Sequence, residues 1–285
     1  MLHRTTRHLL TAALALGPLA LLACGDNKTP APRQGYEAST LPQLSCAPNL
    51  DGTIEAKELR PALGVAVRNL VSPQGKARTV DLVGSGAAPT QAWDLGTDYA
   101  DDQVATISAS AVGDKWYAAT FPSATFTAPL DAGGLVDAIY ANNDTAIVLL
   151  GLASRDADGP GGKTLLVYDA PITIYRFPMT VGAAWSSSAS VKNGTLRGQP
   201  YAGKDTYDVV VDGRGKLVLP DYTFTDVLRV RTTVKVEASA GPPVTVQRQT
   251  SFVFECFGEV ARATSQPNEA QTDFTNAAEL RRLGL

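Results

Sequence analysis

The residue types that most often carry acid–base and nucleophilic chemistry are scarce in this chain. Among its 285 residues there are two histidines, His3 and His8, and three cysteines. Both histidines lie in a stretch with a basic start (Arg4, Arg7), an apolar run over residues 9–22 and a small-residue end, which is typical of a secretory signal. Once such a signal is removed, no histidine remains for a Ser-His or Cys-His relay or for metal ligation. We therefore expect no catalytic residue, no cofactor and no enzymatic activity.

The first of the three cysteines directly follows this stretch, in Leu21-Leu22-Ala23-Cys24. The apolar run before it is shorter than the roughly 20 residues that a membrane-spanning helix needs. The tetrapeptide resembles the lipobox of bacterial lipoproteins. The resemblance implies that the Cys24 thiol takes a diacylglycerol, that residues 1–23 are cut off, and that the new amino terminus is acylated. An ordinary secretory signal with an incidental cysteine is the alternative.

The same resemblance suggests where the protein resides. In enteric bacteria, an aspartate directly after the lipidated cysteine retains a lipoprotein in the inner membrane; here Gly25 takes that place and Asp26 follows one position late. We therefore expect a lipid-anchored protein of the cell outer membrane, whose one identified partner is the membrane, through its amino-terminal lipid. Two of the 25 basic residues precede residue 24, which leaves 23 against 28 acidic ones. Without a basic cluster, nucleic acid is not expected as a partner.

The two other cysteines, Cys46 and Cys256, remain after lipidation. In an oxidising compartment an even pair predicts a disulfide. The alternative is two buried thiols that never meet.

A calcium loop is suggested by the residues after Cys46. Asn49, Asp51, Gly52, Thr53 and Glu58 resemble the second part of an EF-hand or dockerin loop. The resemblance implies ligands from Asn49, Asp51, Thr53 and Glu58. The first ligand position, however, falls on Ala47, which has no carboxylate. We therefore predict no tight metal site and interpret the segment as a glycine turn.

Carboxylates and tryptophans are the remaining candidates for chemistry. Asp98, Asp101 and Asp102 lie in an acidic loop that we interpret as solvated surface. The segment 156–162, Asp-Ala-Asp-Gly-Pro-Gly-Gly, lacks the lysine and helix of a phosphate-binding loop, so it indicates a hairpin or a boundary between lobes. Three tryptophans and a carboxylate pair would suit a carbohydrate binder or a glycosidase, although tryptophans in β proteins are usually core residues. The tryptophans are Trp93, Trp116 and Trp185.

The elements that must position these residues are strands. Alternating apolar and polar residues over 105–111, 207–212, 228–237 and 244–256, and an apolar run over 147–152, predict antiparallel strands. Arg248 falls on the apolar face of its strand and indicates a bulge, an open end or a functional charge. Phe274, Ala277, Leu280 and Leu283, preceded by Asp273 and followed by Gly284, predict a short carboxy-terminal helix.

Three segments are therefore expected: a lipoprotein signal peptide over 1–23, a flexible tether over 24–45 that is rich in proline and polar residues, and a β-rich domain over 46–285. The last is either one unit or two lobes, 46–155 and 164–285, joined by the glycine-rich connector. The predicted class is mostly β: an antiparallel meander or half-barrel, or a sandwich, with a short carboxy-terminal helix.

The second half also resembles β-meander domains of uncharacterised bacterial secreted and lipid-anchored proteins. The matching pieces are Phe177-Pro178, Gly182 and Trp185, then residues 215–220 and 224–230, and a closing strand over 254–262. The resemblance implies an antiparallel meander, in some relatives a curved half-barrel, and brings no catalytic residue. The expected function is a non-enzymatic binding or scaffold domain whose protein or small-molecule partner is unknown. The alternatives are a carrier of an apolar ligand or lipid in a curved β-sheet, and a carbohydrate-binding module.

Overall fold

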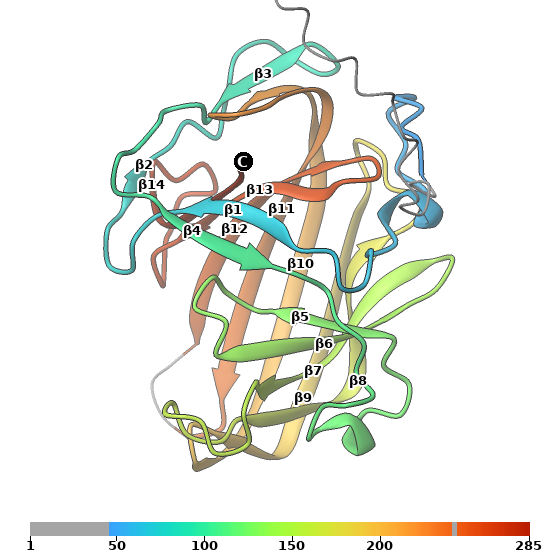
Figure 1. Ribbon diagram of the computed structural model, residues 1–285, viewed down its shortest axis with the longest axis vertical. Coiled ribbons are helices and arrows are strands. Elements are labelled where there is room, and N and C mark those ends of the chain that lie inside the picture. Colours follow the sequence, from blue (N-terminus) through green and yellow to red (C-terminus); the bar gives the residue numbers. More distant parts are fainter. Residues whose placement is uncertain (1–45, 241–243) are drawn as a thin grey trace, which may run out of the picture. The chain divides into compact units, whose positions relative to one another are not determined.

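The computed structural model describes residues 46–240 and 244–285, which form a mostly antiparallel β structure (Figure 1). Two short 3-10 helices interrupt the strands. The elements, in chain order, are η1 (Ala56–Leu59), β1 (Val67–Val71), β2 (Arg78–Thr79), β3 (Gln91–Asp94), β4 (Gln103–Ile107), η2 (Ala118–Thr120), β5 (Phe126–Pro129), β6 (Val136–Asn142), β7 (Ala146–Ser154), β8 (Leu165–Arg176), β9 (Ala184–Leu196), β10 (Gln199–Val218), β11 (Thr223–Ala238), β12 (Thr245–Phe254), β13 (Gly258–Ser265) and β14 (Asn276–Leu283).

All of these strands belong to one sheet, with twelve strands in the order β4-β1-β14-β13-β12-β11-β10-β9-β8-β7-β6-β5. From β5 to β14 the chain is a meander, in which each strand pairs with the next. The sheet curls until its two edge strands nearly meet. There, Ser110 N–H donates to Thr127 O at 2.8 Å, and Thr127 N–H donates to Ser110 O at 2.9 Å. The predicted meander is confirmed, and the alternative of two packed sheets is wrong.

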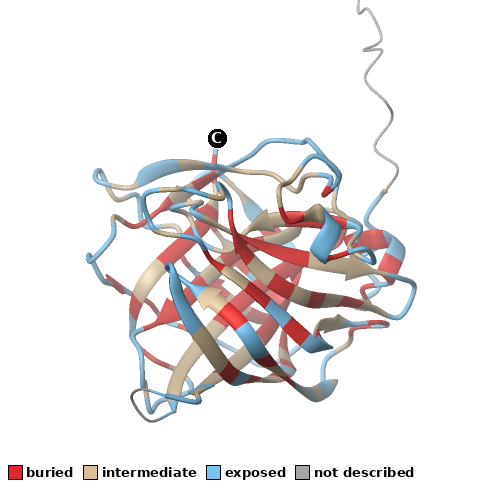
Figure 2. Ribbon diagram, turned by 90° about the horizontal axis from the view of Figure 1, so that it is seen from below, coloured by how far each residue is buried: buried red, intermediate tan, exposed pale blue. Residues whose placement is uncertain are grey.

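The concave face of the sheet carries the inner core. Alternation along β10 places Tyr207, Val209 and Val211 on one face, and Figure 2 shows the resulting alternation of burial along the strands. Val209 and Val211 share a packed cluster with Phe126 of β5 and Ile147 of β7. These strands are far apart in sheet order, so the cluster must lie inside the curled sheet.

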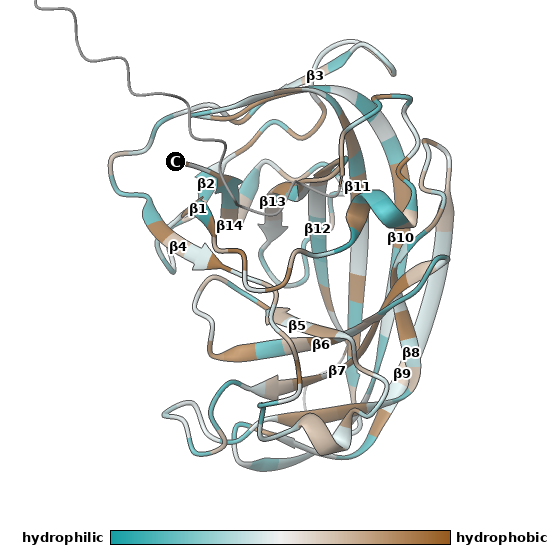
Figure 3. Cartoon of the chain, turned by 45° about the vertical axis from the view of Figure 1, so that its right-hand side comes forward, coloured by the Kyte–Doolittle hydropathy of each residue, from teal (hydrophilic) through white to brown (hydrophobic). Residues whose placement is uncertain are grey.

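Two irregular segments cover the convex face. Residues 72–102 bring Leu82, Trp93 and Leu95 onto the outer side of β11 to β14, where Phe252 packs edge-on against Trp93. Residues 110–124 bring Tyr117 and other aromatic side chains onto β6 and β7. Both faces of the sheet therefore bury apolar residues, and Figure 3 shows apolar and polar residues alternating along the long strands.

One end of the curled sheet is closed by a capping segment, residues 46–60. Ile54 N–H donates to Met179 O, and Met179 N–H donates to Ile54 O, both at 2.9 Å. Ile54 and Leu59 are buried in the inner core. Cys256 N–H donates to Glu58 O at 2.8 Å, so the segment is also fixed to the turn between β12 and β13.

The predicted carboxy-terminal helix is wrong. Residues 276–283 form strand β14, which pairs antiparallel with β13 and with β1. Asp273 caps no helix; its carboxylate pairs with Arg231. A register shift between Thr264 and Ser265 of β13 places Ala277 and Leu280 on the same face of β14, so their spacing of three is compatible with a strand. Pairing on both edges therefore outweighs the helix propensity of a segment rich in Ala, Glu, Leu and Arg.

Candidate functional site

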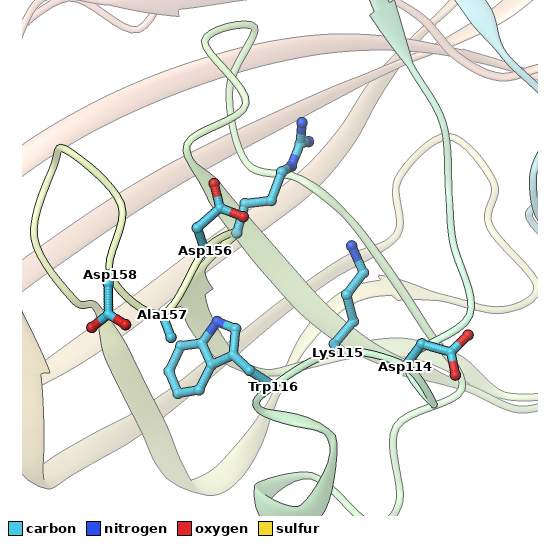
Figure 4. Close-up of a pocket in the computed structure, with 7 residues that line it drawn as sticks. Asp114, Lys115, Trp116, Asp156, Ala157 and Asp158 are labelled. Carbon is cyan, nitrogen blue, oxygen red and sulfur yellow. The ribbon is translucent and has the colours of Figure 1, made fainter.

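A broad, open depression with a volume of about 570 Å³ lies beside Trp116. Figure 4 shows Asp156, Ala157 and Asp158 on one side of the indole and Lys115 and Asp114 on the other. The first group comes from the turn between β7 and β8, and the second from the segment that leads into η2. Aromatic, acidic and basic side chains from two loops thus converge on one open surface.

Trp116 is held in place by contacts on its edge. Its indole N–H donates to the carbonyl of Ser154, at the end of β7, at 2.8 Å, and Tyr117 packs edge-on at 5.5 Å. The ammonium of Lys163 lies 4.9 Å from the ring centroid. The indole is half-buried, so its orientation is fixed while part of it faces the depression.

A second cavity, of about 260 Å³, adjoins this depression and shares Lys115 and Arg155 with it. It lies where β4 and β5 separate beyond the Ser110–Thr127 bridge, and its wall carries hydroxyl groups. Its lining is Thr106, Ser108, Ser110, Lys115, Thr127, Ala128, Pro129, Asp137 and Arg155.

Asp137 is the charged residue at the centre of this cavity, and only 2% of its surface is exposed. The Tyr117 hydroxyl donates to its carboxylate at 2.8 Å, Lys115 Nζ lies at 3.4 Å, and Arg155 Nε at 3.6 Å. Burial raises the pKa of Tyr117, and the neighbouring carboxylate raises it further, so the phenol remains a hydrogen-bond donor at neutral pH. Asp137 thus holds the cationic groups of Lys115 and Arg155 between the two cavities.

The side chains of this arrangement are of kinds that bind polar ligands. Carboxylates accept hydrogen bonds, lysine and arginine donate them, and the indole offers an apolar surface. No histidine lies in the described residues, and the described cysteines are bonded to each other. A serine or threonine here would therefore lack the base that usually activates it.

The predicted disulfide is confirmed. Cys46 Sγ and Cys256 Sγ are bonded, and the two Cα atoms are 5.6 Å apart. The bond joins the capping segment to the turn between β12 and β13. Glu255, next to the bond, accepts from the backbone N–H groups of Asn49 and Leu50 at 2.7 and 2.9 Å.

The candidate calcium ligands are instead used to fold the capping segment. Asn49 Oδ1 accepts from Asp51 N–H, and Asp51 Oδ1 accepts from Thr53 N–H. Glu58 is buried and accepts from Glu55 N–H at 2.9 Å and from Asn49 Nδ2 at 3.3 Å. Over residues 46–240 and 244–285, no group of three or more His, Cys, Asp or Glu side chains is placed to hold a metal ion.

The acidic loop is solvated surface in part: Asp98 and Asp101 are exposed, but Asp102 is not. The Asp102 side chain is 5% exposed and pairs with Arg78 at 2.8 Å and with Arg282. Asp101 pairs with Lys76 and Arg78, which lower the pKa of its carboxyl. The loop thus ties the outer segment 72–102 to the sheet. The glycine-rich connector 156–162 joins the antiparallel strands β7 and β8, so its interpretation as a hairpin turn is confirmed.

The tryptophans have different roles. Trp93 is 1% exposed and belongs to the outer core, and Trp185 donates to Thr173 O at 3.1 Å and packs against the inner core. Trp116 lines the depression described above. Sequence reasoning missed Asp137 and Lys115; the signal available was a single carboxylate inside the otherwise apolar strand β6. Arg248 holds the loop after β13 by donating to the carbonyls of Glu269 and Ala270.

The interior of the curled sheet carries a polar layer. Glu259 accepts from Ser251 Oγ at 2.6 Å and pairs with Arg281, and Arg262 Nη2 donates to Leu130 O at 3.2 Å, across the interior from β13. Burial raises the pKa of Glu259, but Arg262 and Arg281 outweigh it, so the pKa is lowered and the carboxyl is ionised at neutral pH. Charged groups thus lie among the apolar residues of the concave face.

Fold and site together define a class: a single, nearly closed antiparallel sheet with a polar cavity at its seam and a tryptophan-bearing depression beside that cavity. No protein-family model matches the chain, and no curated protein and no solved structure matches it either. In the described part of the chain, no helix is both long enough and apolar enough to cross a membrane. Cys24 and the rest of segment 1–45 lie outside the described residues.

Proposed function

We propose that this chain is a lipid-anchored protein of the outer membrane that binds a polyhydroxylated ligand, a carbohydrate, in the depression beside Trp116 without transforming it. The observation that carries the proposal is the placement of a half-buried indole between carboxylates and cations in an open hollow of about 570 Å³. A sugar presents an apolar C–H face and a rim of hydroxyl groups. The indole suits the first, and Asp114, Asp156 and Lys115 suit the second.

The lipid anchor rests on the residues around Cys24. A basic start, an apolar run too short to span a membrane and the lipobox-like Leu21-Leu22-Ala23-Cys24 support it. In full-length protein made in bacteria, an alkyne analogue of palmitate is expected to label the natural chain and not Cys24→Ser, which becomes soluble. Equal labelling of both forms would contradict the anchor.

The binding site has its own test, on full-length soluble Cys24→Ser protein. We expect a glycan array to identify a ligand whose affinity falls at least tenfold in Trp116→Ala and in Asp156→Asn. Asp98→Asn, which changes an exposed aspartate elsewhere, is the matched control and should bind normally. Binding that is unaffected by Trp116→Ala would refute the site. Release of a cleaved sugar would show that the protein is an enzyme.

A carrier of an apolar ligand is the second candidate, because a curled sheet encloses an interior. The polar layer formed by Glu259, Arg262 and Arg281 argues against a purely apolar occupant, since burying charges beside hydrocarbon is unfavourable. Native mass spectrometry of the protein extracted in mild detergent separates the two candidates: a bound lipid would favour the carrier.

A further inference from the structure

Asp205 of β10 stands apart from the other buried carboxylates. Four acidic residues in the described chain are buried along their backbone as well as their side chain: Glu58, Asp137, Asp205 and Glu255. Glu58 and Glu255 accept from backbone N–H groups, and Asp137 faces two cations. Asp205 is 8% exposed and has one described partner, the Tyr168 hydroxyl, which donates to Oδ2 at 2.5 Å. Its Oδ1 is the one buried carboxylate oxygen among the described residues that has no hydrogen-bond partner.

The neighbours of Asp205 explain why Oδ1 is unpartnered. On the inner face, it lies between Ala189 of β9 and Val236 of β11, and neither side chain can donate a hydrogen bond. No lysine or arginine in the described chain forms an ion pair with it, and burial raises the pKa of its carboxyl. A charged carboxylate without a cation is costly at such a site.

Three tyrosines surround this carboxylate. Tyr168 reaches it from β8, and Tyr207 follows it on the inner face of the same strand. Tyr201 lies on that face on the other side of Gly203, and a Cβ on Gly203 would come within 2.5 Å of the Tyr201 hydroxyl. The absent side chain at position 203 therefore lets Tyr201 fold toward Asp205. Burial raises the pKa of both Tyr201 and Tyr207, and the Asp205 carboxylate raises it further.

Solvent reaches this part of the interior. Tyr201, Tyr207 and Val236 are each only half-buried although they face inward. Asp205 is nine residues from Arg214, which contacts the capping segment through Leu50 O, so the two lie about 30 Å apart along β10. The site is thus near the end of the curled sheet that the capping segment does not close.

We propose that Asp205, together with Tyr168, Tyr201 and Tyr207, binds the methylated ammonium group of a small organic ligand inside the curled sheet. A carboxylate supplies the opposite charge, and aromatic faces attract such cations. A divalent metal ion is a poor fit, because calcium takes six or more oxygen ligands and this cluster offers one carboxylate among aromatic and apolar side chains. The site is separate from the Trp116 depression and does not depend on its function.

Choline and its neutral isostere 3,3-dimethylbutan-1-ol test the proposal on full-length Cys24→Ser protein. We expect saturation-transfer NMR and calorimetry to show that choline binds and the neutral alcohol does not, and that Asp205→Asn weakens choline binding at least tenfold. Asp208→Asn is the matched control, because Asp208 is on the outer face of the same strand and pairs with Lys235. It should bind choline as the unchanged protein does.

Three results would overturn the proposal: no choline binding, equal binding of choline and the alcohol, or full binding by Asp205→Asn. An equal response to potassium chloride would also overturn it, because that would indicate an inorganic ion. Should Asp205→Asn fail to fold, Tyr201→Ala and the pH dependence of the unchanged protein replace it. Choline binding must weaken as the pH falls and Asp205 is protonated, at a pH above the usual range for an aspartate, because its pKa is raised. The other titratable groups facing Asp205 are Tyr168, Tyr201 and Tyr207, which stay neutral at that pH.

Discussion

Arg282 shows how much one buried side chain can organise. It is 1% exposed, its guanidinium donates to the carbonyls of Leu95 and Thr97 at 2.6 Å each, and it pairs with Asp102. These bonds fix the outer segment 72–102 to β14. Its contribution cannot be replaced by another monovalent group, because only the planar fork reaches three acceptors at once.

We predict that Arg282→Ala lowers the free energy of unfolding by about 3–5 kcal/mol, because it removes one of the two guanidinium groups that pair with Asp102 and leaves the carbonyls of Leu95 and Thr97 without their donor beside a cavity. Urea unfolding followed by fluorescence measures this. Lys192→Ala removes one partner of an exposed pair and should change the free energy by less than about 1 kcal/mol. A loss below about 1 kcal/mol in Arg282→Ala would show that water compensates for the missing guanidinium.

At the residue scale, the sequence reveals a pairing when two candidate residues remain. It does not reveal a pairing between residues that are far apart in the chain and have many possible partners. Cys46 and Cys256 could be paired because they were the last two cysteines. Asp102 and Arg282 are 180 positions apart, and no local pattern links them. The Trp116 depression likewise forms where two loops meet, and the order of the strands in the folded sheet determines where these loops lie.

Among the elements, β10 is the strand on which most others depend. It spans Gln199–Val218, pairs with β9 and β11, and at its end also pairs in parallel with the short strand β3. At that crossing a Cβ on Gly215 would come within 1.9 Å of Gln91 O. The close approach of the two strands therefore requires glycine at position 215.

We predict that Gly215→Val displaces β3 and lowers the free energy of unfolding by at least about 1–3 kcal/mol, the usual cost of overpacking. Trp93, buried on β3, would become exposed, and its fluorescence would shift to longer wavelength. Gly161→Val is the control, because no atom lies within 4 Å of its Cβ position. An unshifted spectrum in Gly215→Val would mean that β3 is not held against β10.

The capping segment is the element that the disulfide secures. We predict that the double change Cys46→Ser, Cys256→Ser lowers the free energy of unfolding by up to about 5 kcal/mol, because the bond closes a loop of 210 residues in the unfolded chain. Hydrogen exchange should quicken first at Ile54, whose N–H bonds to Met179. Unchanged stability would mean that Glu255 and the backbone hydrogen bonds hold this segment in place without the disulfide.

The element types followed from local pattern wherever strands alternate cleanly. The strands predicted over 207–212, 228–237 and 147–152 lie within β10, β11 and β7, whereas those predicted over 105–111 and 244–256 extend past the ends of β4 and β12. The exception, β14, has arginines on both faces, Arg281 inward and Arg282 outward, so its alternation of apolar and polar residues is hidden. Its strand state depends on partners that only the folded sheet supplies.

For the described chain as a whole, one sheet crosses the boundary between the two suggested lobes. Strands β7 and β8, on either side of the glycine-rich connector, are hydrogen-bonded neighbours. We predict a single cooperative unfolding transition for residues 46–285, with fluorescence and circular dichroism giving the same midpoint. Two separate transitions would instead indicate lobes that unfold independently.

If the chain is exported as proposed, the neighbours of β14 also set an order of events. The first long strand of the chain, β1, pairs with the last, β14, and β4 joins the sheet only through β1. The Cys46 thiol likewise has no partner until Cys256 emerges, and 29 residues follow Cys256 in the chain. A chain that emerges amino terminus first therefore keeps β1 without its β14 partner until nearly all of it has emerged. The order of the strands thus delays closure of the sheet until the last strand is available.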